Sequence, residues 1–273
     1  MDTNHVESLL SFLKTPLDSG DAIFARFSAL PGAVTGEGDT PLKRFVYVPG
    51  TRKDRVLLVA HIDTVWDRVY KRAFSGERDV VFEDGVFSSS NPDCGIGADD
   101  RAGCALLWEM RDSGHSLLIT DGEEHGMFGA KYLKEAHKAL FRELNCHAYM
   151  IELDWAYADG CLYTGVDCSK KFKRFITDTF GFVPHKGGGT DLRVLCKRIC
   201  GVNLGIGYRD FHKNSETLLL SEWESTLSRL KAVLALPQKQ FAAPILPPVI
   251  RFAKRCAKKA IAILKAPFAK KSA

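Results

Sequence analysis

Residues 56–65 read VLLVAHIDTV, and this stretch decides the fold. Its first five residues are apolar, and a short apolar run of this length predicts a strand buried inside a sheet. The polar residues His61 and Asp63 follow directly, at the position where that strand would end. Because ligands of open α/β sheets gather at the carboxyl ends of strands, the stretch also indicates where a functional site could lie.

The alternation of strand and helix continues along the chain. Short apolar runs predict further strands at residues 116–120, 148–153 and 199–206. Apolar residues at helical spacing predict helices at residues 102–112, 129–144, 170–180 and 221–236. Strands that alternate with helices predict an α/β fold, here a three-layer α/β/α sandwich with a mixed, largely parallel sheet.

The composition is that of an ordinary globular protein. Of the 273 residues, 45% are hydrophobic and 26% are charged, which excludes a mostly disordered or collagen-like chain. The sequence has no run of about 20 apolar residues, the length that a membrane-spanning helix needs. Its first residues do not resemble a secretory signal. We therefore expect a cytoplasmic protein.

The positive charge of the chain lies near its C-terminal end. Residues 244–273 hold eight Lys or Arg and no acidic residue, so subtracting these eight from the net charge of +5 leaves the other residues at −3. A body with that balance does not favour nucleic acid, and no specific nucleic-acid partner is expected. We predict one folded domain over residues 1–240, followed by a Pro-rich linker and a basic amphipathic tail over residues 241–273.

The tail combines an apolar helical face with basic residues. Between residues 249 and 264, apolar residues recur at helical offsets, and most of the lysines and arginines fall on the other side. One interpretation is that the apolar face docks on the folded domain. The second is that residues 249–271 bind an anionic membrane surface, where each basic side chain contributes about 1 kcal/mol. The third is nucleic acid or an acidic protein partner, which the single aromatic residue of the stripe, Phe252, disfavours. The second interpretation adds a peripheral membrane location to the cytoplasmic one.

Acidic residues and histidines recur where the predicted strands end. Imidazole nitrogen and carboxylate oxygen are zinc ligands, and a carboxylate can bridge two ions about 3.5–4 Å apart. One such residue alone is more often a hydrogen-bonded or surface group, so the ordered set is what indicates a two-metal site. The set comprises His61 and Asp63, Asp99 and Asp100, Glu123 and Glu124, Glu152 and Asp154, and His212.

Adjacency separates some of the roles. At a strand end His61 can bind metal while Asp63 contacts the other imidazole nitrogen. Glu123 and Glu124 are neighbours in the sequence, so we do not expect them to do the same work. One can hold metal while the other faces a water molecule as general base.

Six stretches of the chain, in order, resemble the co-catalytic di-zinc peptidases. This superfamily contains the zinc aminopeptidases and related carboxypeptidases and deacylases. The matching stretches span residues 56–216. They are VLLVAHIDTV (56–65), GIGADDRAG (95–103), LLITDGEEHGMFGA (117–130), MIELDW (150–155), GGGTDL (187–192) and YRDFHKNSE (208–216).

The resemblance implies a role for each matching residue and makes residues 1–240 a di-zinc peptidase-like catalytic domain. Two zinc ions are implied, although cobalt or manganese would suit the same ligands. His61 and Asp154 would bind the first ion, Glu124 and His212 the second, and Asp99 both. Asp63 would orient His61, and Glu123 would be the general base.

Some assignments stay open. Asp100 could exchange roles with Asp99, and Glu152 competes with Asp154. Trp155 stands where relatives often carry a basic residue, which leaves the substrate preference undetermined. The expected substrate contacts are Asp191, His185 and His125.

The function implied is hydrolysis of a peptide or aminoacyl substrate, with an aminopeptidase as the first choice. Two metals would activate a water molecule, and Glu123 would take its proton and return it to the leaving amine. Only 57 residues separate Asp154 from His212, too few for an inserted dimerisation domain of about 100 residues. The alternatives are an amide deacylase or carboxypeptidase on the same metals, and a catalytically silent protein that binds peptides or a partner.

Overall fold

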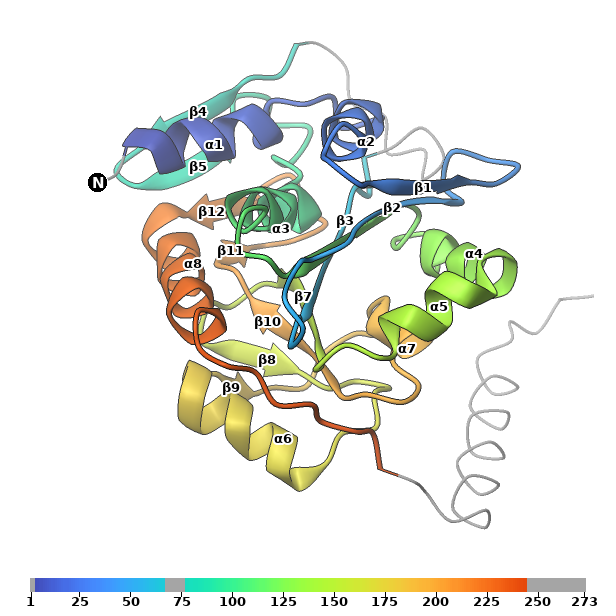
Figure 1. Ribbon diagram of the computed structural model, residues 1–273. Helices are drawn as coiled ribbons and strands as arrows, with labels where there is room; N and C mark the ends of the chain where they lie inside the picture. The colour runs from blue at the N-terminus through green and yellow to red at the C-terminus, as the bar shows by residue number, and fades with distance from the viewer. Residues whose placement is uncertain (1–2, 67–76, 245–273) are drawn as a thin grey trace, which may run out of the picture. The chain divides into compact units, whose positions relative to one another are not determined.

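The computed structural model describes residues 3–66 and 77–244 (Figure 1). The first compact unit of the chain spans Met1–Ala243. The predicted tail over residues 249–271 lies outside the described residues. No helix in the described part of the chain is both long and apolar enough to cross a membrane.

A mixed eight-stranded sheet forms the centre of the fold, in the order β1-β2-β6-β3-β7-β10-β8-β9. Its middle strands β6, β3, β7 and β10 run parallel. Antiparallel pairs join β1 to β2, β2 to β6 and β8 to β10, and β9 pairs parallel with β8. The strands are β1 (Val34–Glu37), β2 (Arg44–Val48), β3 (Leu57–His61), β6 (Ser116–Thr120), β7 (Met150–Trp155), β8 (Gly160–Leu162), β9 (Val183–Pro184) and β10 (Gly201–Gly205).

Helices cover both faces of this sheet (Figure 1). In β3, Leu58 and Ala60 belong to one hydrophobic core and Leu57 and Val59 to the other, as the period of two along a strand requires. The predicted three-layer α/β/α fold is therefore confirmed. On the Leu58 side lie α1 (Thr3–Leu13), α2 (Asp21–Ser28), α3 (Ala98–Glu109), α6 (Lys170–Phe175) and α8 (Leu220–Leu234); on the other lie α4 (Phe128–Ala136), α5 (Lys138–Leu144) and α7 (Leu192–Leu195).

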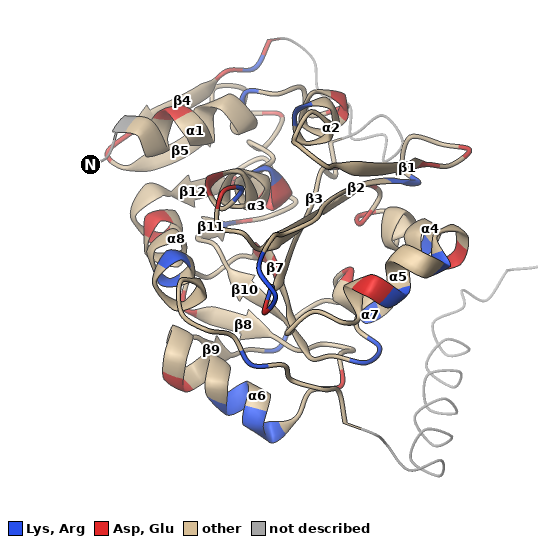
Figure 2. Cartoon of the chain, viewed as in Figure 1, with Lys and Arg blue, Asp and Glu red and all other residues tan. Residues whose placement is uncertain are grey.

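Helix α6 illustrates how sequence pattern fixes a helix on the sheet. Ser169 caps its first turn, because the serine hydroxyl accepts a hydrogen bond from the amide of Phe172. The Phe172 side chain is fully buried, while the lysines and arginine of the helix form a basic outer band (Figure 2). The predicted helix over residues 170–180 continues past α6 as a π-helical turn, η1 (Ile176–Phe180).

Two predicted boundaries differ in the structure. The single helix expected over residues 129–144 is two helices, α4 and α5, because His137 has φ −112° and ψ 55° between them. The folded domain also continues beyond residue 240. Phe241 is buried, packs against the rings of Phe172 and Phe175, and donates its amide to the Ala148 carbonyl at 2.8 Å.

A second, four-stranded sheet was not predicted. It has the order β11-β12-β5-β4, with β4 (Val80–Glu83), β5 (Val86–Ser89), β11 (Tyr208–Arg209) and β12 (Thr217–Leu219). Asp84 and Gly85 join β4 to β5 with φ values of 49° and 81°, the left-handed conformation that a two-residue hairpin needs. This sheet holds the connection between β11 and β12, which carries His212.

Candidate metal centre

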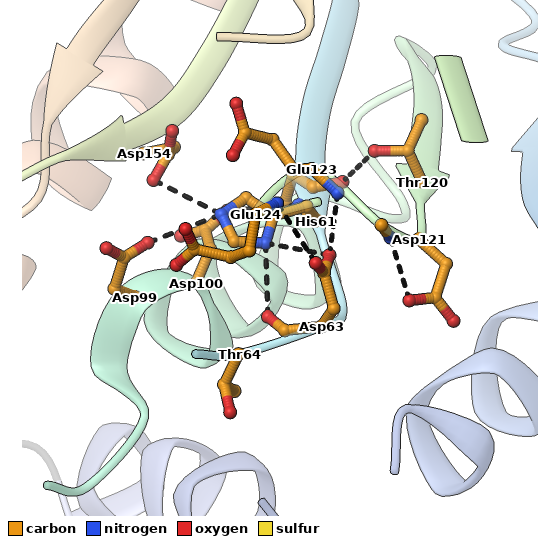
Figure 3. A network of polar contacts seen from close by, with 12 residues as sticks. His61, Asp63, Thr64, Asp99, Asp100, Thr120, Asp121, Glu123, Glu124 and Asp154 are labelled. Carbon is orange, nitrogen blue, oxygen red and sulfur yellow. Dashed lines mark hydrogen bonds and ion pairs between the residues drawn. The ribbon is translucent and has the colours of Figure 1, made fainter. Parts of the chain in front are cut away.

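Three neighbouring parallel strands place the polar residues together. His61 ends β3, Glu123 and Glu124 follow β6, and Asp154 lies near the end of β7. Because β6, β3 and β7 run in the same direction side by side, their carboxyl ends meet at one edge of the sheet. Asp99, at the start of α3, faces the same edge (Figure 3).

Asp99 lies between the two histidines. Its Oδ1 is 3.3 Å from His61 Nε2, and its Oδ2 is 3.0 Å from His212 Nε2. The same nitrogen of each imidazole also faces a second carboxylate. Asp154 Oδ1 is 3.5 Å from His61 Nε2, and Glu124 Oε1 is 2.8 Å from His212 Nε2. The five residues expected to bind metal therefore converge, with Asp99 at the centre.

Asp100 does different work from Asp99. Its two carboxylate oxygens accept the backbone amides of His61 and Gly103, each at 3.1 Å. A Cβ on Gly103 would lie 2.3 Å from Asp100 Oδ1 and 2.1 Å from the Leu153 carbonyl, so this close approach requires glycine. One carboxylate oxygen of Asp100 nevertheless lies within 4.8 Å of atoms on His61 and Asp154 that could bind the same metal ion. Its hydrogen bonds nonetheless favour a supporting role.

Asp63 connects His61 with the glutamate pair. His61 Nδ1 lies 3.3 Å from the Asp63 carboxylate and 3.1 Å from the Asp63 carbonyl oxygen. The same carboxylate accepts the backbone amides of Glu123 and Glu124, each at 3.0 Å. Asp63 therefore fixes both the imidazole and the loop that carries the two glutamates.

Asp154 and Glu152 also separate. Glu152 accepts the amides of Asp191 and Leu192 at 3.2 and 3.4 Å. Asp154 is held by two residues that sequence analysis missed. Asn203 donates to the Asp154 carbonyl at 2.8 Å and accepts its amide at 2.9 Å, and the Tyr208 hydroxyl donates to Asp154 Oδ1 at 3.3 Å. The polar Asn203 inside the apolar predicted strand 199–206 was the available signal.

Mutual contacts shift the pKa values of the cluster strongly. Burial would lower the pKa of His212, but Asp99 and Glu124 outweigh it and raise the value to about 10. Burial likewise opposes a rise at His61, yet Asp154, Asp63 and Asp99 hold its pKa well above the ordinary value. The pKa of Glu123 is raised by burial, with Asp154 adding to the effect and His61 opposing it. The buried carboxylates of this cluster are charges that need a positive partner.

The donor set fits a bound cation. Glu124 Oε1 is buried and faces His212 Nε2 without hydrogen-bond geometry, and the two contacts of His61 Nε2 are long for hydrogen bonds. Donor atoms of His61, Asp99 and Glu124 lie within 4.8 Å of one another. A set of imidazoles and carboxylates suits zinc, with related divalent metals as alternatives.

A cleft of about 160 Å³ opens onto these residues. Its floor is acidic, and one wall is apolar, with Trp155, Leu162 and Phe211. No Lys or Arg is among its lining residues within the described ranges. The lining comprises Asp99, Glu123, Glu124, Asp154, Trp155, Leu162, Gly188, Gly189, Thr190, Asn203, Tyr208, Phe211 and His212.

The three expected substrate contacts do not line this cleft. Asp191 is fully buried, and its Oδ2 accepts the Thr120 hydroxyl. Its neighbour Thr190 lines the cleft instead. His185 is exposed and stacks on Tyr157 with ring centroids 6.3 Å apart. His125 packs near Phe128, at 6.4 Å.

The chain is similar in sequence to one described family. Residues 45–179 match the model of peptidase family M28, a stretch that contains every candidate ligand except His212. A search of curated proteins found no match.

Solved structures share the fold at low sequence identity. Aminopeptidase PepT from Bacillus cereus has a TM-score of 0.61 and 16% identity, over 85% of this chain and 98% of that chain. A tripeptidase from Staphylococcus aureus has a TM-score of 0.61 and 14% identity, over 86% and 98%. The TET1 peptidase of Pyrococcus horikoshii has a TM-score of 0.59 and 15% identity, over 84% and 99%.

Proposed function

Since this chain carries a peptidase family M28 domain and is a metallopeptidase, we propose that it is an aminopeptidase with two zinc ions. The observation that carries the choice of aminopeptidase is the lining of the cleft. Four carboxylates lie there, and the described residues contribute no Lys or Arg. The earlier alternative of a catalytically silent protein is set aside, because the family is one of hydrolases.

The charge of the cleft separates the kinds of peptidase. A free N-terminal amine is a cation and would be attracted to carboxylates that the metals do not fully neutralise. A carboxypeptidase must instead bind a terminal carboxylate, which normally requires an arginine or lysine in the cleft. A deacylase needs neither a negative cleft for an amine nor a positive residue for a carboxylate. The cleft charge therefore does not exclude it, and its N-acyl substrates must be tested directly against free-amine substrates.

The chain's own residues divide into two metal positions. The first metal position comprises His61 and Asp154, and the second comprises Glu124 and His212, with Asp99 shared. When bound, the ions would polarise the scissile carbonyl and make a water molecule more acidic. Asp63 keeps His61 in orientation through its Nδ1 contact.

Glu123 is suited to move the proton. Its side chain lines the cleft, and its backbone amide is fixed by Asp63 at 3.0 Å, while adjacent Glu124 turns toward His212. Burial raises the pKa of the Glu123 carboxyl, which strengthens it as a base. Glu123 would take a proton from the attacking water and return it to the leaving amine.

The test is a substrate panel with metal analysis on the full chain. Aminoacyl amides, N-acylated amino acids and peptides with a blocked N-terminus are compared, and bound metal is counted per chain. We expect turnover of free-amine substrates and two ions per chain. Faster cleavage of N-acyl substrates would favour a deacylase, and release of C-terminal residues from N-blocked peptides would favour a carboxypeptidase.

A further inference from the structure

We propose that Glu216 is a positioning residue for the second metal position, an inference that rests on the two-metal site proposed above. Glu216 is 2% exposed. Its Oε2 accepts the backbone amide of Gly97 at 2.7 Å, and its Oε1 accepts the amide of Asp99 at 3.1 Å. One buried carboxylate therefore holds the backbone from which the shared ligand Asp99 projects.

Glu216 also belongs to the short connection that carries His212. This connection runs from β11 to β12, and the Glu216 amide turns back to the Lys213 carbonyl at 3.2 Å. His212 has φ 62°, a left-handed conformation that costs a non-glycine residue energy and needs support from its surroundings. Glu216 thus ties the His212 segment to the Asp99 segment, the two segments whose side chains meet at 3.0 Å.

The loop before Asp99 is shaped around this carboxylate. A Cβ on Gly95 would lie 2.5 Å from Glu216 Oε2 and 2.8 Å from the Lys213 carbonyl. Gly97, which donates the shorter bond, has φ 69°, a conformation that favours glycine. Contact this close leaves the loop little freedom to move relative to Glu216.

The other candidate ligands have supports of their own. Asp63 holds the amides of Glu123 and Glu124, Asp100 holds the amide of His61, and Asn203 holds the backbone of Asp154. Removing the Glu216 carboxylate therefore leaves the first metal position with its supports from Asp100 and Asn203. The second metal position loses the link between His212 and Asp99, so we expect it to weaken first.

Glutamine is the informative replacement for Glu216. Its side chain has nearly the same shape but only one acceptor oxygen, and its NH2 group would face a backbone N–H. One buried amide would then lose its partner. Mutation of a residue that supports a metal ligand in this way typically lowers metal affinity 10- to 100-fold.

The experiment follows metal retention in the full chain. Wild type, Glu216→Gln and Glu216→Asp are dialysed against graded chelator, and zinc per chain is counted by mass spectrometry. A matched control is Glu222→Gln, because Glu222 anchors β11 through Arg209 at 2.6 and 2.8 Å without touching the Asp99 loop. We expect one of the two ions to leave Glu216→Gln at a chelator concentration 10- to 100-fold lower than in wild type. The Glu222→Gln control should lose its ions as wild type does. Added zinc should restore the turnover that Glu216→Gln has lost.

Each other result overturns the inference. If Glu216→Gln keeps two ions and loses them at the same chelator concentrations as wild type, Glu216 does not position the second metal. Simultaneous loss of both ions would show that Glu216 does not act on the second metal position in particular. Loss of folded structure by circular dichroism in both Glu216 variants would assign the residue to the fold. Fewer than two ions in the wild type itself would instead refute the two-metal site, and with it this inference.

Discussion

Replacing Glu123 by glutamine tests the proposed chemistry most directly. The Glu123 backbone amide is held by Asp63, and that hydrogen bond does not depend on the side chain. Its carboxylate lines the cleft, whereas the close imidazole contacts are made by Asp99, Asp154 and Glu124. The nearly isosteric amide should therefore leave the metal site intact and remove only the base.

The expected loss in kcat is about 10²–10⁴-fold, the usual contribution of a positioned general base. This corresponds to about 3–5 kcal/mol of transition-state stabilisation at 1.36 kcal/mol per tenfold. The assay measures steady-state kcat and KM on an aminoacyl amide, with zinc per chain counted on the same samples. We expect KM to change little, because Glu123 acts on the proton rather than on substrate binding.

Glu124→Gln is the matched comparison, since it changes the neighbouring residue in the same way. Glu124 contacts His212 at 2.8 Å, so this variant should lose metal from the second metal position. If Glu123→Gln loses metal while Glu124→Gln keeps it, the two roles are reversed. If Glu123→Gln keeps both its metal and its full activity, the general-base assignment is refuted.

Three further predictions concern other parts of the chain. Asp99→Ala should hold fewer than two ions and hydrolyse nothing, whereas Asp100→Ala should be milder; equal metal content in Asp99→Ala and wild type would reject the shared ligand. Burial lowers the pKa of His147 to about 4 in the folded chain. In the unfolded chain the pKa of this histidine is about 6.5, so as the pH falls the unfolded chain binds the proton before the folded chain does. Stability to urea should therefore fall by up to about 3 kcal/mol between pH 7 and pH 4, and by less in His147→Gln; an equal fall would contradict this. For the tail, the full chain should sediment with anionic vesicles at low salt more than a chain ending at Ala243; equal sedimentation would reject the membrane interpretation.

The features that the sequence predicts correctly are those that a local pattern of apolar and polar residues determines. Strand 116–120 was predicted to the residue, because an apolar run bounded by polar turns leaves little choice of register. The candidate ligand residues could also be named, since each stands directly after or beside such a run; that they bind metal stays a prediction. The second sheet was missed because β11 has two residues and β12 has three, too short for any periodicity to show.

The supports of the site depend instead on contacts between distant parts of the chain. Asn203 reaches Asp154 across 49 residues, and Glu216 reaches Gly97 across 119. Asp191 has the correct motif but is turned into the core by its bond with Thr120. No local pattern states which way such a side chain turns, so these roles required the structure.

The site contains more acids than the two proposed metals need. In two of the acidic pairs the two side chains have different partners. Asp99 faces the histidines while Asp100 binds amides, and Asp154 faces His61 while Glu152 binds amides. A buried carboxylate that accepts two backbone N–H groups is satisfied without metal, and it fixes a loop more rigidly than a neutral group could. Carboxylates therefore hold the backbones of three candidate ligands, His61, Asp99 and Glu124. On the proposed function, each supporting acid is a place where metal affinity can be changed without removing a ligand.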